Sequence, residues 1–196
     1  MDPLIGALIL LFLALSTGCL VYLHFLPTGL NPLRNAVSEY GAGRFRFWYQ
    51  AMCVNQAIAA FLTAAVLATK VQSAPFTTDL SLVVLGLARL IIAKAPVTVV
   101  RGKRKTVNGT HLLMAAIIFT SAVVASASFT RHIAGNSEWL NVAKALSVFE
   151  WSILIFALAT TVTVIVPRGI RYLGTAERLL YISIIGWFAV IGIHLL

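Results

Sequence analysis

Six apolar stretches, each close to the length that crosses a bilayer, constrain this chain more than any other feature. They cover approximately residues 4–26, 48–69, 79–98, 111–129, 140–166 and 178–196. A helix needs about 20 apolar residues to cross a hydrocarbon core of about 30 Å. The composition agrees, because 60% of the 196 residues are hydrophobic and only 11% are charged. The sequence therefore predicts an all-α membrane protein, a six-transmembrane-helix bundle that forms one domain over residues 1–196.

The basic residues fall unevenly on the two sides of such a bundle. The net charge is +9, and alternating the loops leaves Lys70 and Arg131 on one side. The other side collects Arg34, Arg44, Arg46, Arg101, Lys103, Arg104, Lys105, Arg168, Arg171 and Arg178. Because basic loops face the cytoplasm, we expect a protein of the cytoplasmic membrane with both termini outside. This placement favours membrane lipids as partners and argues against nucleic acid.

Two opposite charges interrupt the apolar stretches. Arg89 lies in the third stretch and Glu150 in the fifth. An ionised side chain at bilayer depth costs about 2.5 to 3.5 kcal/mol, so it normally faces a partner or a wet cavity. At 1.5 Å per residue, both lie about 15 Å below the outer ends of their predicted helices. The sequence predicts an intramembrane charge pair between Arg89 and Glu150, or alternatively a substrate or proton site of a small transporter.

The longest connection, at about residues 28–47, lies on the predicted cytoplasmic side. Long loops in compact chains are more often functional than short ones. Its polar groups need partners if it folds back onto the bundle, because unpaired backbone at membrane depth is costly. Other polar side chains on the same side are His24, His111, Glu177 and Arg178.

Three motifs carry a resemblance to a known family. They are Asn31-Pro-Leu with Val37-Ser-Glu-Tyr-Gly41 in the long loop, Gly109-x-His111, and Gly174-x-x-Glu177-Arg178. Together they resemble the bacterial membrane family named domain of unknown function nine-nine-eight, and the resemblance covers essentially the whole chain. Because that family has no assigned activity, the resemblance implies a six-helix fold and a cytoplasmic-side cluster, but no reaction.

The imidazole and carboxylate groups near the loop allow several kinds of site. His24, Glu39, His111 and Glu177 have no metal-ligand spacing on any helix, so no metal is predicted. His24 and His111 are alternatives as axial haem ligands of a redox module. An intramembrane lipid-modifying enzyme would use His24 or His111 as a base, with Ser38 as a candidate nucleophile. The same groups are also suited to a hydrogen-bonded network that docks the loop on the bundle.

The leading hypothesis is that the protein binds a polar or anionic ligand, such as a lipid headgroup. The ligand would lie in a cytoplasmic-side cavity roofed by the long loop. The residues expected to contact it are Arg34, Tyr40, Arg44 and Arg178, with hydrogen bonding set by His24, Glu39, His111 and Glu177. No cofactor is predicted. A further alternative is an accessory subunit of a larger membrane complex, with another membrane protein as its partner.

Overall fold

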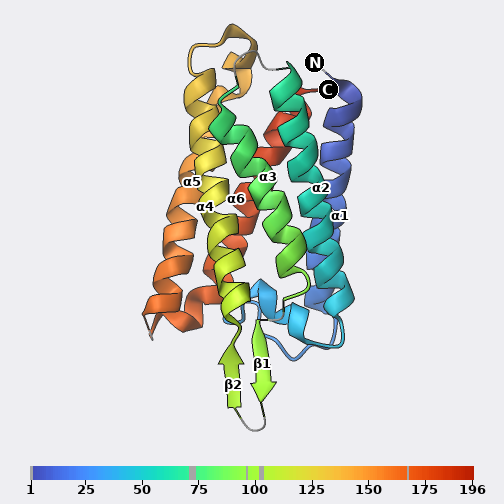
Figure 1. Cartoon of the computed structure of the whole chain (residues 1–196), viewed down its shortest axis with the longest axis vertical. Coiled ribbons are helices and arrows are strands. Elements are labelled where there is room, and N and C mark those ends of the chain that lie inside the picture. Colours follow the sequence, from blue (N-terminus) through green and yellow to red (C-terminus); the bar gives the residue numbers. More distant parts are fainter. Residues whose placement is uncertain (1, 71–73, 96, 102–103, 167) are drawn as a thin grey trace.

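The computed structural model contains six long α-helices that run up and down between the two ends of a bundle (Figure 1). It describes residues 2–70, 74–95, 97–101, 104–166 and 168–196. The long helices are α1 (Pro3–Phe25), α2 (Arg46–Lys70), α3 (Phe76–Ile92), α4 (Gly109–Ile133), α5 (Leu140–Ile165) and α6 (Leu173–His194). Short 3-10 helices occur at η1 (Val37–Ala42), η2 (Ser137–Trp139) and η3 (Gly169–Tyr172).

One short segment differs from the predicted helix pattern. The third helix was expected to reach residue 98, but α3 ends at Ile92 and two strands follow it. Strand β1 (Thr98–Arg101) pairs antiparallel with β2 (Arg104–Val107), with Thr98 opposite Val107. The β-branched run at residues 97–100 favours extended backbone over helix, and sequence analysis missed that signal. Lys103, one of the basic residues assigned to this side, lies outside the described residues.

Five helical segments are long and apolar enough to cross a membrane. They are Pro3–Phe25, Arg46–Thr69, Gly109–Ile133, Ser137–Ile165 and Gly169–His194. Helix α3 has 17 residues and is not among them. The described part of the chain is therefore that of an integral membrane protein with five candidate spans, and the predicted sixth span rests on the shortest of the long helices.

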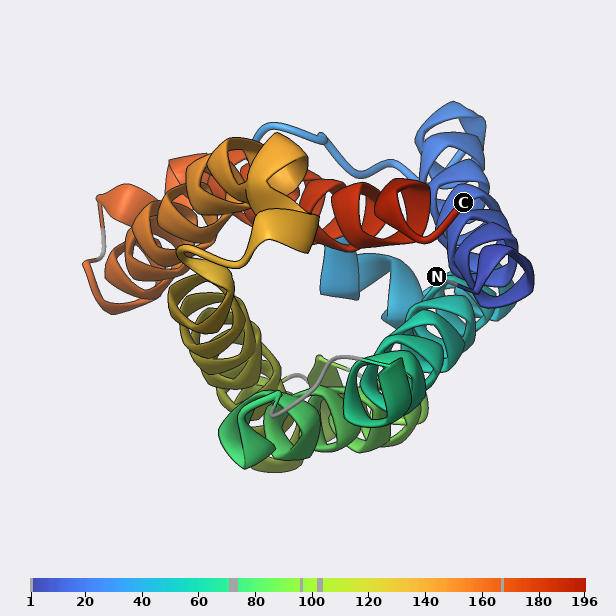
Figure 2. The same cartoon turned by 90° about the horizontal axis from the view of Figure 1, so that it is seen from above.

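The six long helices form a closed ring in chain order. Each helix from α1 to α5 packs against the next one along the chain, and α6 packs against α1 to close the ring. The view from above shows η1 within the outline of the ring (Figure 2). Because η1 contacts both α2 and α6, the long loop folds inward at one end of the bundle instead of extending away from it.

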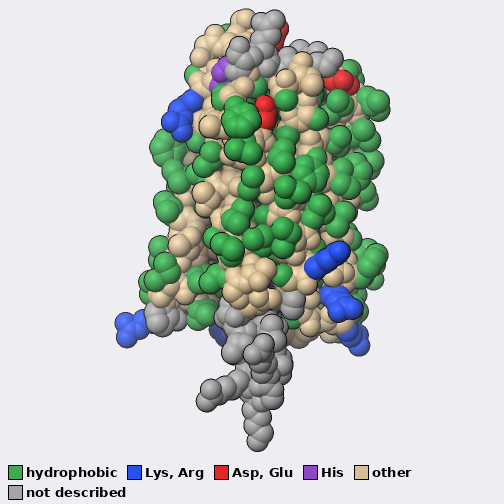
Figure 3. Space-filling model, in the orientation of Figure 1, with side chains coloured by type: hydrophobic (Ala, Val, Ile, Leu, Met, Phe, Trp, Pro, Cys, Tyr) green, Lys and Arg blue, Asp and Glu red, His purple; other side chains and the backbone are tan. Residues whose placement is uncertain are grey.

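The surface matches a membrane environment. Large apolar side chains are exposed along the outer faces of the helices, among them Leu11 and Leu15 of α1, and Trp151 and Leu158 of α5. On the face shown in Figure 3, hydrophobic side chains cover the middle of the molecule, and Lys and Arg gather toward the end that carries β1 and β2. Such a surface is stable in contact with acyl chains and unstable in water.

Small residues allow α2 and α3 to approach closely. Ala60 and Ala64 of α2 are buried, and so is Gly86 of α3. A Cβ placed on Gly86 would lie 2.5 Å from the ring of Phe61 on α2. Since apolar burial gives little driving force between helices in lipid, this close packing has to hold them together.

Replacing Gly86 with Ala tests that packing. The added methyl overlaps the Phe61 ring, so we expect the Gly86→Ala variant to lose about 1–3 kcal/mol, measured as a lower thermal unfolding midpoint in detergent. Gly18→Ala in α1 is the matched control because open space surrounds Gly18, and its midpoint should not fall. Equal midpoints for the two variants would contradict the close approach of α2 and α3.

Candidate functional site

The loop between α1 and α2 is shaped by one of its own carboxylates. Glu39 Oε1 accepts a hydrogen bond from the backbone N–H of Ala36 at 2.8 Å. Its Oε2 accepts from Asn35 Nδ2 at 2.9 Å. Both carboxylate oxygens therefore serve to start η1, as acidic side chains do in the first turn of a helix.

Helix α6 holds this loop against the end of the ring. Glu177 Oε2 accepts a hydrogen bond from the backbone N–H of Val37 at 2.7 Å. The backbone N–H and the hydroxyl of Thr175 both donate to the carbonyl of Leu33, each at 3.2 Å. Thr175 and Glu177, two residues apart on α6, thus bind two separate points of the loop.

Arg178 adds a third attachment through several donors. Its Nη1 donates to the carbonyls of Asn35 at 2.9 Å and Gly174 at 2.8 Å. Its Nε donates to His24 Nε2 at 2.9 Å, and its Nη2 lies 3.5 Å from the Tyr40 hydroxyl. One guanidinium thereby joins α1, the loop and α6, and we call His24, Asn35, Glu39, Tyr40 and Arg178 the loop network.

Both ring nitrogens of His24 are engaged in this network. Its Nδ1 lies 2.6 Å from the carbonyl of Leu20, and its Nε2 accepts from Arg178. A carbonyl can only accept, so the proton is on Nδ1 and Nε2 provides the lone pair. Ligation of haem iron at Nε2 would therefore have to displace Arg178.

The other predicted residues lie outside the loop network. His111 Nδ1 is 2.7 Å from the carbonyl of Ala95, just beyond the end of α3. Ser38 is buried in η1, whereas Arg34 and Arg44 are exposed. Among the described residues there is no group of three or more His, Cys, Asp or Glu side chains that could hold a metal ion.

A second polar group surrounds Arg89 inside the ring. The Arg89 side chain is only 2% exposed, and its Nη1 donates to the Tyr181 hydroxyl of α6 at 2.7 Å. The guanidinium carbon lies 4.7 Å from the centre of the Tyr181 ring. Tyr49 and Cys53 of α2, and Glu177 of α6, lie near it, and the Cys53 thiol lies beside both the guanidinium and the Tyr49 side chain. We call these five residues the Arg89 cluster, and Glu177 links it to the docked loop.

Several buried polar atoms in this interior lack partners. Arg89 Nε and the Tyr49 hydroxyl have no hydrogen-bond partner among the described residues. The same holds, within that part of the chain, for Gln56 Oε1 and Trp187 Nε1. Buried polar groups are paired in the great majority of cases, so each exception calls for an explanation such as a bound water or ligand.

Arg89 and Glu150 are not brought together. Because α3 ends at Ile92, Arg89 lies about one turn from the end of its helix, close to the loop, whereas Glu150 lies in the middle of α5. In the ring α3 packs between α2 and α4, and α5 packs between α4 and α6. Arg89 instead reaches across the interior to Tyr181.

Sequence analysis did not identify Tyr49, Cys53, Gln56 or Tyr181 as site residues. A signal was present, because Tyr49, Cys53 and Gln56 follow a spacing of four and three residues and so share one face of α2. Glu177 and Tyr181 are likewise four residues apart on α6. The sequence does not reveal that both faces meet the same arginine.

A comparison with protein families matches residues 5–194 to one described as Protein of unknown function (DUF998). The match confirms the resemblance seen in the loop motif and in the two helix motifs. It extends from α1 to the end of α6, so the loop network and the Arg89 cluster both lie within it. No curated protein and no solved structure matches the chain.

Substitution of Gly174 tests whether α6 docks the loop. A Cβ there would lie 2.5 Å from the carbonyl oxygen of Pro32, so Gly174→Val should displace the loop. We make the substitution in a Ser38→Cys background and measure the rate at which a water-soluble maleimide labels the thiol introduced at position 38 in place of the buried serine. We expect labelling to become about tenfold faster, because lowering the free energy of local opening of the loop by about 1.4 kcal/mol raises the open population tenfold. Gly109→Val is the control, because open space surrounds Gly109. Unchanged labelling in Gly174→Val would contradict the docking.

Proposed function

We propose that this chain, which belongs to the DUF998 family of proteins of unknown function, binds a small polar or anionic ligand of lipid-headgroup chemistry inside the ring. The observation that carries the proposal is the buried Arg89 guanidinium, whose Nε has no partner among the described residues. An N–H of a charged group that lacks a strong acceptor in an apolar interior costs about 1–3 kcal/mol or more, and the thiol of the nearby Cys53 is only a weak acceptor. An acceptor supplied by a ligand would remove that cost.

The charges around Arg89 support an anionic ligand. The hydrogen bond from Nη1 goes to a neutral hydroxyl, that of Tyr181, and not to a carboxylate. Glu177 is the acidic member of the Arg89 cluster, and its Oε2 already accepts a hydrogen bond from the backbone N–H of Val37. A guanidinium in this state is suited to phosphate or carboxylate oxygens, which it binds with two parallel hydrogen bonds.

Neutral polar groups on the face of α2 that carries Tyr49 and Cys53 would orient such a ligand. The Tyr49 hydroxyl can donate or accept, and Gln56 presents an amide oxygen; both atoms are buried and without a partner among the described residues. Binding sites commonly combine apolar walls with a few convergent polar groups of this kind. The ligand would therefore be small and have both hydrogen-bond donors and an anionic group.

The loop network would roof this site. Arg178 and His24 are occupied in holding the loop, which makes them positioning residues and not ligand contacts. Arg34 and Arg44 are exposed on the same loop, where cations attract anionic headgroups. This division of roles replaces the expectation that Arg34, Arg44 and Arg178 all contact the ligand.

We further propose that α3 is a sixth span and that the basic end of the ring faces the bacterial cytoplasm, with both termini outside. Helix α3 packs between two candidate spans, α2 and α4, and its 17 residues extend over about 25 Å. The concentration of Lys and Arg at the end with β1 and β2 supports this orientation (Figure 3).

Glu150 favours a second candidate role, as a subunit of a larger membrane complex. Its side chain is only partly buried in the middle of α5, beside the exposed Val148 and Trp151. A carboxylate at this depth normally faces a partner. A basic side chain of another membrane protein would provide one.

Arg89→Gln tests the interior site. We expect dihexanoyl phosphatidic acid to raise the thermal unfolding midpoint of the purified wild type and to bind the variant at least about thirtyfold more weakly, because truncating a buried charge partner costs about 2 kcal/mol or more. Without ligand, the variant should unfold at a lower temperature than the wild type, because it loses the hydrogen bond to Tyr181 and the positive charge near Glu177. Binding is therefore measured as the shift that the ligand causes in the midpoint of each protein.

Lys94→Gln is the matched control for this experiment, because Lys94 is exposed two residues beyond the end of α3. It should bind the lipid like the wild type. Repeating the titration with glycerol 3-phosphate distinguishes a free anion from a lipid headgroup. Equal stabilisation of wild type and Arg89→Gln by both compounds would refute the proposed site.

Cysteine labelling tests the sixth span and the orientation together. Phe76 and Lys94 are both exposed, at opposite ends of α3, while the native Cys19 and Cys53 are buried. In intact bacteria, a membrane-impermeant thiol reagent should label Phe76→Cys and not Lys94→Cys. Labelling of both would argue against α3 as a span, and labelling of Lys94→Cys alone would reverse the orientation.

A further inference from the structure

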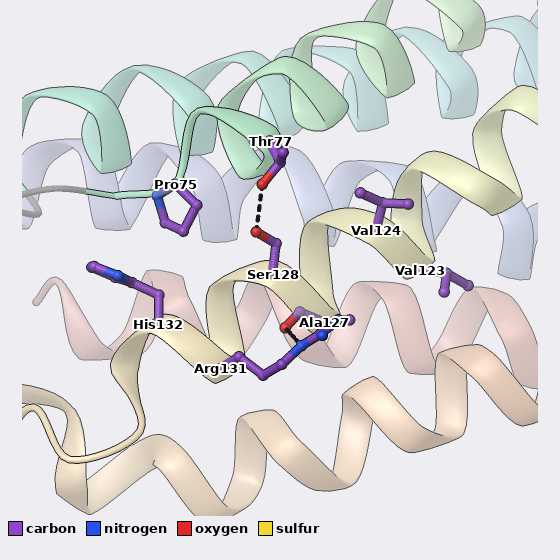
Figure 4. A pocket seen from close by; sticks show the side chains of 8 residues that line it. All are labelled: Pro75, Thr77, Val123, Val124, Ala127, Ser128, Arg131 and His132. Atoms are coloured by element: carbon purple, nitrogen blue, oxygen red, sulfur yellow. Dashed lines mark hydrogen bonds between the residues drawn. The ribbon is translucent and has the colours of Figure 1, made fainter.

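A pocket of about 650 Å³ lies between α3 and α4, at the end of the ring opposite the docked loop (Figure 4). Its walls come from the first turn of α3 and from the last three turns of α4. It is separate from both the loop network and the Arg89 cluster. Any occupant would therefore be distinct from the ligand proposed above.

The pocket changes from polar to apolar along α4. Arg131 and His132 lie in the last turn of α4, whereas Val123 and Val124 lie about 14 Å from its end. Figure 4 shows the two valines at one side of the pocket and His132 at the other, with the Thr77 and Ser128 side chains between them. In a spanning bundle, the polar part lies at headgroup depth and the valines at acyl-chain depth.

The polar part can donate hydrogen bonds to an anion. Thr77 Oγ1 and Ser128 Oγ are 2.6 Å apart, and whichever hydroxyl accepts in this pair keeps its own proton for another acceptor. Arg131 Nε donates to the carbonyl of Ala127 at 3.0 Å. Within the described part of the chain its two terminal amino groups have no hydrogen-bond partner, so they can donate to a ligand. The described residues that line the pocket include no acid.

We propose that this pocket binds one phospholipid with an anionic headgroup, taken from the leaflet at that end of the ring. The phosphate lies against Arg131 and the Thr77–Ser128 pair, and the first part of an acyl chain lies along Val123 and Val124. The apolar half of the pocket favours a lipid over a soluble anion as the occupant. Val124 is exposed there, and a free phosphate would leave its side chain uncovered, whereas an acyl chain would cover it. Few basic residues lie at this end, so Arg131 gives the pocket a charge that its surroundings lack.

Native mass spectrometry of the purified full chain, titrated with dioleoyl phosphatidylglycerol, tests the charge. Arg131→Gln should weaken binding about fivefold, the effect of one cation beside an anionic lipid, and Arg131→Lys should retain it. Arg171→Gln is the matched control, because Arg171 is also exposed and also donates from Nε to a backbone carbonyl, at the opposite end of the ring. Wild-type affinity in Arg131→Gln, or an equal loss in Arg171→Gln, would overturn the proposal.

A pocket-filling variant tests the shape independently of charge. Ala127→Leu places a larger side chain beside Val123 and Val124, and it should weaken binding of both phosphatidylglycerol and phosphatidylcholine. Undiminished binding of both lipids would show that the pocket is not the site. The effect of Arg131→Gln should also be the same in an Arg89→Gln background, since distant sites act additively. A smaller effect in that background would assign the lipid to the interior site and overturn this proposal.

Discussion

The hydrogen bond between the Glu177 carboxylate and the backbone N–H of Val37 joins the two parts of this molecule that carry its polar chemistry. Without it, η1 would place an unpaired backbone donor at the end of an apolar ring, and Glu177 would be buried with one fewer partner. Both outcomes are costly where water is excluded. Docking of the loop and burial of the carboxylate therefore support each other, and the same carboxylate lies near Arg89.

The closed ring shields its polar interior from lipid. Neighbouring helices cover one another all the way round, so Arg89, Tyr49 and Tyr181 can face inward while large apolar side chains face outward. The interior atoms that have no partner among the described residues distinguish this protein from a bundle stabilised only by packing. They are the physical reason for proposing a ligand there, and the separate α3–α4 pocket extends the same reasoning to the outer surface.

Much of the architecture could be predicted because the bilayer imposes a length on every apolar stretch. The helix at α1, and the need of the long loop for hydrogen-bond partners on the bundle, follow from residue pattern alone. The end of α3 was predicted at residue 98 instead of Ile92, because hydropathy does not separate helix from strand in a short run. Lys94, Pro96 and the β-branched residues 97–100 were the signals in the sequence against a longer helix. Because the predicted helix extended to residue 98, Arg89 was expected at mid-membrane, at the same depth as Glu150, and the two were predicted to pair.

The order of residues is enough to show that this chain enters a membrane through long apolar helices, that its basic residues gather on one side, and that a few polar side chains need partners. Those conclusions depend on hydrophobicity and spacing, which are properties of the chain taken one segment at a time. The folded bundle was needed to show that Arg89 meets Tyr181, that Arg178 binds His24, and that His111 lies apart from both. Pairings between helices depend on which faces meet across the ring, and that information is not local to any segment.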